Sequence, residues 1–300
     1  MPATSASATI LVTGASGHIG RKVCSLLWAG SHEVLAADVR PNTDERIARC
    51  DIRNNDQIVH ILESHPIRTV IHLAAVLPTA FRADPVAAAE VNLTGTLNLL
   101  REAATHGVGR FVFGSSMSVY GSSHTPRPLR ECDPAAPDEP YGASKRMVEL
   151  VGENLAAARG LGFVSLRIAR VVGPGARNTA STWRSQIFEA ADAPDQPPIS
   201  IPFAPSARLS LVHVDEVARM LMLLAETAGL PRRIYNSPVE VLETQQLAEL
   251  VQGMRKVCVQ TGEAHGGPIC DGTLFAGDFG FRLRGLADFL SIHRSLPSRE

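Results

Sequence analysis

The segment TGASGHIG at residues 13–20 constrains the fold of this chain more than any other feature. It follows a short apolar run and opens a helical pattern, and its glycines Gly14, Gly17 and Gly20 are spaced G-x-x-G-x-x-G. This is the spacing of a strand-to-helix turn in which a backbone without Cβ atoms approaches a pyrophosphate closely. The helix N-terminus then offers free N–H groups to the phosphates. A glycine-rich turn without a ligand is the alternative.

Apolar runs and helical patterns alternate along the first two-thirds of the chain, which is typical of a parallel sheet with crossover helices. The order predicts an α/β chain with a Rossmann-type doubly wound parallel sheet. In such a sheet the ligand binds in the crevice at the carboxyl ends of the strands. The predicted strands are Thr9–Thr13, Glu33–Ala37, Thr69–Leu73, Arg110–Ser115 and Phe163–Ile168, and the predicted helices are His18–Ala29, Asn55–Ser64, Pro85–His106 and Tyr141–Ala158.

The rest of the chain predicts a second, smaller part. We expect residues 1–172, joined by 208–236, to form the dinucleotide-binding domain, and residues 173–207 with 237–300 to form a substrate-binding lobe. Residues 255–300 carry no pattern that predicts an element. The shorter elements expected elsewhere are helices over Thr182–Ala191 and Asp215–Thr227 and strands over Leu209–Val214 and Arg233–Asn236.

Asp38 ends the second predicted strand, eighteen residues beyond Gly20. A carboxylate at this place accepts hydrogen bonds from the adenosine ribose and repels a 2′-phosphate, so it favours NAD over NADP as the cofactor. Arg21 and Arg40 are close enough in sequence to bind a phosphate, which leaves NADP open. An ordinary turn residue at a strand end is the alternative for Asp38.

Tyr141 and Lys145, in the segment YGASK, lie four residues apart and therefore on one face of a predicted helix. The chain has only three tyrosines, so the pairing has weight. A free phenol titrates near about pH 10, and a nearby ammonium lowers that pKa by stabilising the phenolate. Tyr141 could then accept the proton of an alcohol while a hydride leaves the carbon. An exposed helix face without chemistry is the alternative.

A run of serines follows the predicted strand that begins at Arg110, in the segment FVFGSSMSVYG. Their position puts them at the same sheet edge as the glycine loop. A hydroxyl there can donate a hydrogen bond to the reacting oxygen and stabilise its developing charge. We expect Ser116 to be the third catalytic residue, with Ser115 and Ser118 as neighbours, although any single serine could be structural.

Composition and charge exclude several function classes. The chain has 300 residues, 45% of them hydrophobic, and a formal net charge of −1. It can bury a substantial core, and no global field favours nucleic acid or an anionic membrane. No signal peptide or membrane-spanning run is found, so we expect a cytoplasmic protein. Five scattered cysteines without C-x-x-C predict reduced thiols, and no bound metal is expected, because Cys258, His265 and Cys270 match no familiar ligand spacing.

The motifs together resemble the extended short-chain dehydrogenase/reductase superfamily, in its NAD-dependent epimerase/dehydratase family. The likeness covers about residues 8–240 and includes the glycine segment, Asp38 and YGASK. The other segments that carry it are CDIRN (50–54), IHLAAV (71–76), NLTGTLNLL (92–100), SSMSVYG (115–121), LRIARVVGPG (166–175) and VHVDEVA (212–218).

The resemblance implies site residues that the motifs alone do not. In the family, the residues matching Asp51 and Ile52 contact adenine, and the active-site Ser or Thr lies four residues before the tyrosine of V-Y-G, which selects Ser116. The full set of expected cofactor-binding residues is Gly14, Ser16, Gly17, His18, Ile19, Gly20, Asp38, Asp51, Ile52, Leu73, Ala74, Ala75, Asn92, Ser115, Tyr141, Lys145 and Ile168.

The resemblance constrains the reaction less than the cofactor. Sugar-nucleotide 4,6-dehydratases carry an acidic pair where this chain has Met117 and Ser118, which argues against dehydration. The leading expectation is a homodimeric epimerase of a sugar or nucleotide sugar that oxidises a secondary alcohol transiently and retains its NAD. Arg170 departs from it, since many epimerases have Asn there. The expected substrate residues are Val76, Ser118, Arg177 and Arg208.

Two other functions stay open. Residues 173–190 resemble threonine and sugar-acid dehydrogenases equally well, so an NAD-dependent dehydrogenase of a sugar acid or small hydroxy acid with net NADH release is the first alternative. Arg177 and Arg208 fit either reaction, since a guanidinium binds a diphosphate or a carboxylate in the same bidentate way, and both could equally be solvated loop residues. A dinucleotide-binding sensor without chemistry is the second alternative.

Overall fold

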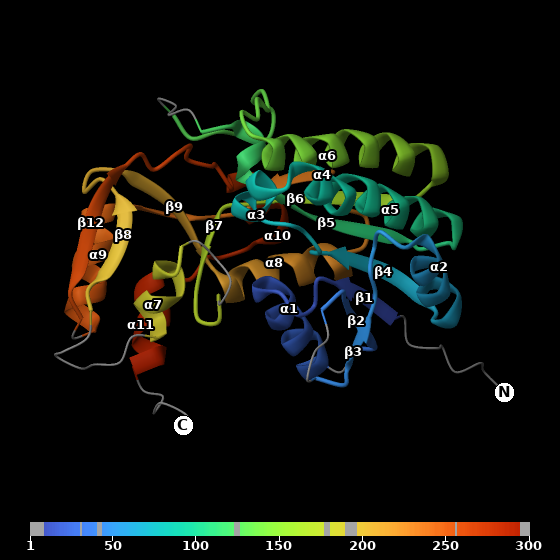
Figure 1. Cartoon of the computed structure of the whole chain (residues 1–300), viewed down its shortest axis with the longest axis horizontal. Coiled ribbons are helices and arrows are strands. Elements are labelled where there is room, and N and C mark those ends of the chain that lie inside the picture. Colours follow the sequence, from blue (N-terminus) through green and yellow to red (C-terminus); the bar gives the residue numbers. More distant parts are fainter. Residues whose placement is uncertain are drawn as a thin grey trace. The chain divides into compact units, whose positions relative to one another are not determined.

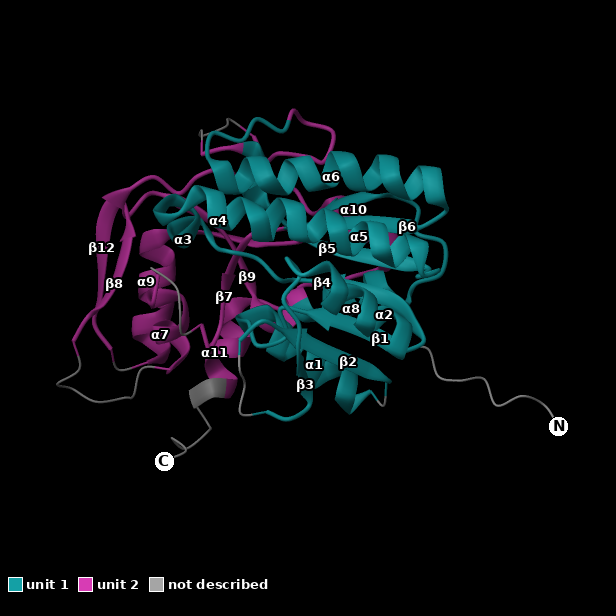
Figure 2. Cartoon of the chain, turned by 45° about the vertical axis from the view of Figure 1, so that its right-hand side comes forward, with its two compact units in different colours: residues 1–120, 135–167, 218–235 teal, residues 121–134, 168–217, 236–300 magenta. Residues whose placement is uncertain are grey.

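The computed structural model describes residues 9–30, 32–40, 44–122, 127–176, 181–189, 197–255 and 257–294. The chain divides into two compact units, shown in different colours in Figure 2. The first unit consists of residues 1–120, 135–167 and 218–235, and the second of residues 121–134, 168–217 and 236–300.

A seven-stranded sheet forms the centre of the first unit, in the order β10-β6-β5-β4-β1-β2-β3 (Figure 1). The pairs β1–β2, β1–β4, β2–β3 and β4–β5 are all parallel. The predicted doubly wound α/β fold is therefore confirmed. The strands are β1 (Thr9–Thr13), β2 (Val34–Asp38), β3 (Ile47–Arg49), β4 (Ile67–His72), β5 (Arg110–Ser116), β6 (Gly162–Ile168) and β10 (Ile234–Asn236).

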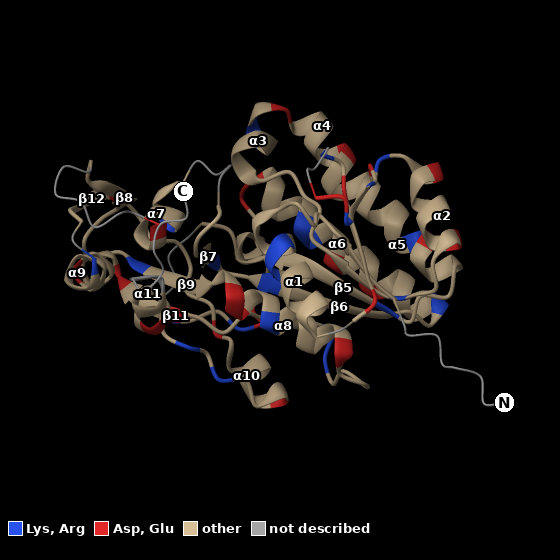
Figure 3. Ribbon diagram, turned by 90° about the horizontal axis from the view of Figure 1, so that it is seen from below, with Lys and Arg blue, Asp and Glu red and all other residues tan. Residues whose placement is uncertain are grey.

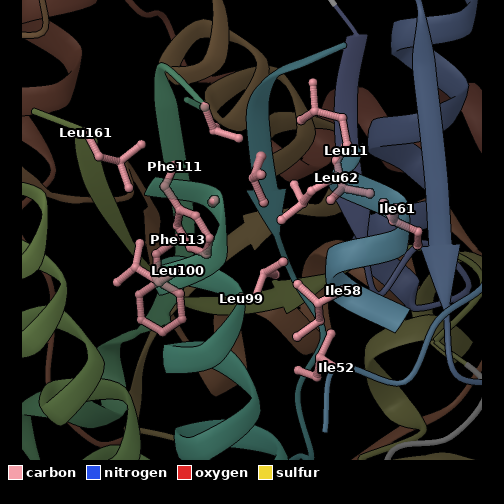
Figure 4. Packing of buried hydrophobic residues seen from close by; sticks show 14 of the residues in the cluster. Leu11, Ile52, Ile58, Ile61, Leu62, Leu99, Leu100, Phe111, Phe113 and Leu161 are labelled. Carbon is pink, nitrogen blue, oxygen red and sulfur yellow. The ribbon is translucent and has the colours of Figure 1, made fainter. Parts of the chain in front are cut away.

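Helices cover both faces of this sheet. In Figure 1, α2 (Asn55–Ser64), α5 (Thr96–Thr105) and α6 (Pro140–Arg159) lie on one side, and α1 (His18–Ala29) and α8 (Val214–Glu226) lie on the other. The apolar faces of α2 and α5 pack against the middle strands, where the phenyl rings of Phe111 and Phe113 from β5 meet Leu99 and Leu100 (Figure 4). Burial of this surface is the main stabilising contribution to the unit.

The single helix predicted over residues 85–106 is three segments in the structure. Helix α4 (Pro85–Ala89) leads into a π-helical turn (Glu90–Gly95), which leads into α5. The wider turn is accompanied by a close contact between Gly95 and Ile52: a Cβ on Gly95 would stand 3.0 Å from the Ile52 carbonyl oxygen. Such turns are frequent at functional sites.

The second unit contains a three-stranded sheet in the order β11-β9-β7 and a two-stranded sheet of β12 and β8. Its core contains Trp183, Leu211, Leu247 and Phe289. The elements are β7 (Arg170–Val172), α7 (Trp183–Glu189), β8 (Ile199–Phe203), β9 (Arg208–His213), β11 (Glu240–Glu243), α9 (Thr244–Met254), β12 (Val259–Ala264), α10 (Thr273–Phe279) and α11 (Leu286–Arg294).

Sequence patterns predicted α7 and β9 in this unit but none of the elements after residue 236. For strand β12, with the sequence VQTGEA, the reason is that it has no buried residue and so carries no apolar alternation. In the described part of the chain, no helix combines the length and the apolar character that crossing a membrane requires.

Candidate active site

The glycine loop connects β1 to α1 and has no room for side chains at two of its glycines. Gly14 has a positive φ of 72°, and a Cβ there would stand 2.6 Å from the backbone nitrogen of Ala74. A Cβ on Gly20 would lie 2.1 Å from the Gly14 carbonyl oxygen. Helix α1 begins without a side-chain cap and without an acidic residue in its first turn, which contains His18 and Ile19. The helix N-terminus therefore keeps its positive electrostatic character, which suits an anion.

Asp38 lies at the end of β2 and faces this loop. Its carboxylate accepts hydrogen bonds from the backbone nitrogens of Ser16, at 3.0 Å, and Arg40, at 3.1 Å. The side chain is buried, so these two bonds hold a negative charge at a fixed place beside the glycine loop. Basic residues lie near the start of α1, which carries no acidic residue in its first turn (Figure 3).

The segment from Leu73 to Val76 follows β4 and lies against the glycine loop through the contact between Gly14 and Ala74. Asn92, in the π-helical turn, is buried and forms two hydrogen bonds with the backbone of this segment. Its amide donates to the Val76 carbonyl oxygen at 2.9 Å and accepts from the Val76 nitrogen at 2.7 Å. In the structure Asn92 therefore fixes the conformation of the segment from Leu73 to Val76 by hydrogen bonds to the Val76 backbone.

Tyr141 is buried near the first turn of α6, where its ring packs with Phe81, Ala88 and Val76. Burial raises the pKa of Tyr141 to about 12, while a hydrogen bond with the Ser116 side chain lowers it and the charge of Glu139 raises it further. Ser116 Oγ in turn donates to Ser118 Oγ at 3.2 Å and accepts from the Ser118 nitrogen at 3.1 Å. The phenol and the Ser116 hydroxyl thus meet at the carboxyl end of β5.

Close approach of α6 to the serine segment depends on Gly142. A Cβ at that position would stand 2.2 Å from the Ser118 carbonyl oxygen. The glycine between Tyr141 and Ala143 is therefore what allows the helix to bring the phenol to the serines.

Lys145 lies one turn beyond Tyr141 on α6 and is buried. Its ammonium is 5.8 Å from the centre of the Tyr141 ring and 4.7 Å from that of Phe113. Its Nζ donates a hydrogen bond of 2.8 Å to the carbonyl oxygen of Gly114. Burial lowers the pKa of Lys145 to about 8, partly opposed by the negative charge of Glu149, so the amine is mainly protonated at neutral pH.

Sequence reasoning missed a buried charge network behind these residues. The Glu149 carboxylate, fully buried on α6, accepts hydrogen bonds from Arg167 Nε and Nη2 at 2.9 and 2.8 Å and from Ser115 Oγ at 2.7 Å. Arg167 also donates to the Tyr120 hydroxyl. The signal was present, because Glu149 repeats the spacing of Tyr141 and Lys145 on a buried helix face.

A second missed residue is His72, the last residue of β4. It is buried between two threonines, with Nδ1 2.6 Å from Thr13 Oγ1 and Nε2 2.9 Å from Thr96 Oγ1. Burial, with the charge of Lys145, lowers the pKa of His72 to about 3. The imidazole is therefore neutral at physiological pH and ties together β1, β4 and α5.

The remaining predicted residues lie as follows. Asp51 forms a bidentate ion pair with Arg53, and Ile52 is part of the core. Ile168 is the buried last residue of β6, and Arg208 is the exposed first residue of β9; both are counted in the second unit. Arg177 lies outside the described residues.

Comparison with known proteins yields one family. A model of the NAD dependent epimerase/dehydratase family matches residues 10–237. The UDP-glucose 4-epimerase of Rhizobium meliloti (strain 1021) is 30% identical over 181 residues, which cover 58% of this chain and 55% of that protein. The mitochondrial L-threonine 3-dehydrogenase of Bos taurus is 26% identical over 253 residues, 81% of this chain and 67% of that protein.

Among solved structures, the UDP-glucose 4-epimerase of Thermus thermophilus in complex with NAD is 25% identical, with a TM-score of 0.81, and the match covers 96% of this chain and 99% of that one. The matches span only about half the length of the curated epimerase relatives. The family model covers far more than half of this chain, and it confirms the resemblance of the motifs. The chain belongs to the NAD dependent epimerase/dehydratase family.

Proposed function

We propose that this protein is an NAD-dependent enzyme that oxidises a secondary alcohol of a carbohydrate substrate, and that it acts as an epimerase of a sugar or nucleotide sugar. The observation that carries the proposal is the contact between the Tyr141 phenol and the Ser116 hydroxyl, with the Lys145 ammonium one helical turn away. These three groups lie in the unit that contains the glycine loop.

The residues of this unit fit a dinucleotide. Gly14 packs against the Ala74 backbone and Gly20 against the Gly14 carbonyl oxygen, which allows the tight strand-to-helix turn of a dinucleotide site. The uncapped start of α1 suits a pyrophosphate. When bound, NAD would supply the acceptor for the hydride. Asp38 would bind the ribose hydroxyls, and its fixed negative charge favours NAD over NADP.

In the proposed reaction, Tyr141 Oη takes the proton from the substrate hydroxyl, and Ser116 Oγ donates a hydrogen bond to the same oxygen. With a pKa of about 12, the phenol of the protein alone is a poor base at neutral pH. A positive charge arriving beside it would stabilise the phenolate and lower that pKa. Tyr141 then returns the proton when the ketone is reduced on its opposite face, which inverts the carbon.

The test is to incubate the enzyme with UDP-glucose and, separately, with other sugar candidates, and to follow product formation together with absorbance at about 340 nm, where NADH absorbs. Interconversion of the two C4 epimers without lasting NADH accumulation is expected. Net NADH formation equal to the substrate consumed would contradict an epimerase.

A second candidate is a dehydrogenase that oxidises a sugar acid or a small hydroxy acid, reduces NAD and releases NADH. The observation in its favour is the longer match to the bovine L-threonine 3-dehydrogenase, which covers 81% of this chain against 58% for the Rhizobium epimerase. The same assay, run also with L-threonine and other hydroxy acids in the presence of excess NAD, distinguishes the two, because only the dehydrogenase accumulates NADH.

We also infer a homodimer, with the second unit as the substrate-binding lobe and the cytoplasm as the location. Exposed apolar side chains on α4 and α6 support the dimer: Val86 is 73% exposed, Met147 47% and Leu150 42%. No disulfide joins any of the five cysteines, all of which lie in described residues, and this supports a reducing compartment. Light scattering of the wild type and of a Val86→Glu/Leu150→Glu variant tests the dimer, since the variant is expected to be monomeric.

A further inference from the structure

Two arginines in the second unit are largely buried, and the charge of one acts on the other. Arg170 begins β7, and Arg184 lies in the first turn of α7. Their backbones are linked near this point, since the Gly173 nitrogen donates to the Arg184 carbonyl oxygen at 3.0 Å. In the described residues neither guanidinium forms an ion pair. The acidic residue of α7, Glu189, instead accepts a hydrogen bond from the Gly175 nitrogen.

The donors of these side chains are only partly used. Arg170 Nη2 donates to the Gly266 carbonyl oxygen at 3.1 Å, but its Nε and Nη1 are buried with no acceptor among the described residues. The same holds for Arg184 Nε and for the indole Nε1 of Trp183. Buried donors in proteins are almost always paired, so these donors, which find no acceptor in the described residues, indicate a place for an acceptor from a ligand.

Aromatic rings hold the two guanidiniums in place. The Arg170 guanidinium lies 4.4 Å from the centre of the Phe203 ring, and that of Arg184 lies 5.9 Å from the Trp183 ring. Trp183 in turn packs edge-on against Phe203 at 6.2 Å. This packing fixes the guanidiniums at low cost in side-chain entropy, so their donors are pre-organised for a ligand.

The charges of the two residues act against each other. Burial, followed by the charge of Arg184, lowers the pKa of Arg170 to about 9, and burial lowers the pKa of Arg184. With a pKa of about 9, Arg170 remains mainly charged at neutral pH. Two like charges in a site of low dielectric are costly, and an anion between them would relieve the repulsion.

We propose that Arg170, Arg184 and Trp183 form a binding site for an oxyanion, either a carboxylate or a phosphate, carried by a small polar molecule such as an acidic sugar. The planar fork of a guanidinium matches both groups, and the indole N–H adds a neutral donor. This inference does not rest on the proposed catalytic function, because the site lies within the second unit and binding requires no turnover.

The experiment measures binding to the full chain without added NAD. Trp183 is one of only two tryptophans, so a Trp28→Phe background makes its fluorescence the reporter of the site. Three sugars that differ in charge are titrated separately: D-glucuronate with a carboxylate, D-glucose 1-phosphate with a phosphate, and neutral D-glucose. A saturable change is expected with at least one of the two anionic sugars, at concentrations where D-glucose gives none. The anionic sugar that gives the stronger response shows whether the site prefers a carboxylate or a phosphate.

Two variants test the assignment in the same background. Arg170→Met should weaken binding of the responding sugar at least about tenfold, because it removes charge-assisted hydrogen bonds. Arg282→Met, which alters an exposed arginine of the same unit, should leave the affinity unchanged. Arg184→Gln is the second site variant and is used if Arg170→Met does not fold. The proposal is overturned if no sugar binds, if D-glucose binds as tightly as the anions, or if a folded site variant binds like the wild type.

Discussion

Lys145 donates a hydrogen bond of 2.8 Å from Nζ to the carbonyl oxygen of Gly114, two residues before Ser116 on β5. The ammonium is thus fixed to the strand that carries the serine, rather than to the phenol alone. Glu149, one turn further along α6, contributes a negative charge that raises the pKa of Lys145, and it accepts a hydrogen bond from Ser115. Helix α6 and strand β5 are therefore joined by these two polar contacts in addition to the hydrogen bond between Tyr141 and Ser116.

The first prediction concerns the phenol. Tyr141→Phe should reduce turnover by about 10²–10⁴-fold, the usual contribution of a positioned proton-transfer group. The affinity for NAD, measured by calorimetry, should change little, since the glycine loop and Asp38 are untouched. Tyr235→Phe, at a buried tyrosine outside the site, is the control and should keep full turnover. Turnover of Tyr141→Phe at the wild-type rate would show that another group takes the proton.

The second prediction separates crowding from backbone strain in the glycine loop. Gly14 and Gly107 both have φ of 72°, but a Cβ on Gly14 would stand 2.6 Å from backbone atoms, whereas a Cβ on Gly107 would have nothing within 4 Å. Gly107→Ala should cost only the strain of a positive φ, about 1–2 kcal/mol. Gly14→Ala should cost clearly more and should also weaken NAD binding, because the residues after β4 must move. Urea denaturation and calorimetry measure the two effects, and equal losses in both variants would contradict the close approach.

The third prediction concerns Glu149. Glu149→Gln leaves the buried guanidinium of Arg167 without a compensating charge, so the free energy of unfolding should fall by about 3–5 kcal/mol. Glu153→Gln, on the same helix but only half-buried, is the matched control and should cost less than about 1 kcal/mol. Urea denaturation of the two variants and the wild type measures the difference, and equal losses would show that the buried pair adds nothing.

The pH dependence of turnover in the Glu149→Gln variant gives a second test of this residue. Because the carboxylate raises the pKa of Lys145, its loss should lower that pKa further below its value of about 8. The decline of turnover with rising pH should therefore begin at a lower pH in Glu149→Gln than in the wild type. An unshifted pH profile would show that Glu149 has only a structural role.

The fourth prediction concerns the pH dependence of stability. The pKa of His72 falls from 6.5 to about 3 in the folded chain, so between these values the unfolded chain binds the extra proton and the folded chain does not. The contribution of neutral His72 to the free energy of unfolding is fully present above pH 6.5. It is lost as the pH falls toward about 3, by roughly 3–5 kcal/mol in total. His72→Gln should flatten this part of the denaturation profile, while exposed His60→Gln should not change it.

Local sequence patterns were sufficient for much of the first unit. Thr9–Thr13, His18–Ala29 and Asn55–Ser64 were predicted with the bounds that the structure has. Each of these elements shows its own periodicity and, for α2, its own cap, since the Asn54 side chain accepts from the Gln57 nitrogen. The sequence did not reveal the π-helical turn before α5, because the contact that accompanies it joins Gly95 to Ile52, distant in the chain.

By itself the sequence determined the Rossmann-type order of strands and helices and the glycine loop, and it supplied the residue types of the proposed catalytic set, because these follow from short-range spacing. Only the tertiary structure decided the surroundings of those residues: that Lys145 bonds to Gly114, that Glu149 is paired with Arg167, and that Arg170 and Arg184 come together in the second unit. The reason is physical. Burial, pKa and charge pairing depend on which distant segments pack around a side chain, and spacing along the chain does not contain that information.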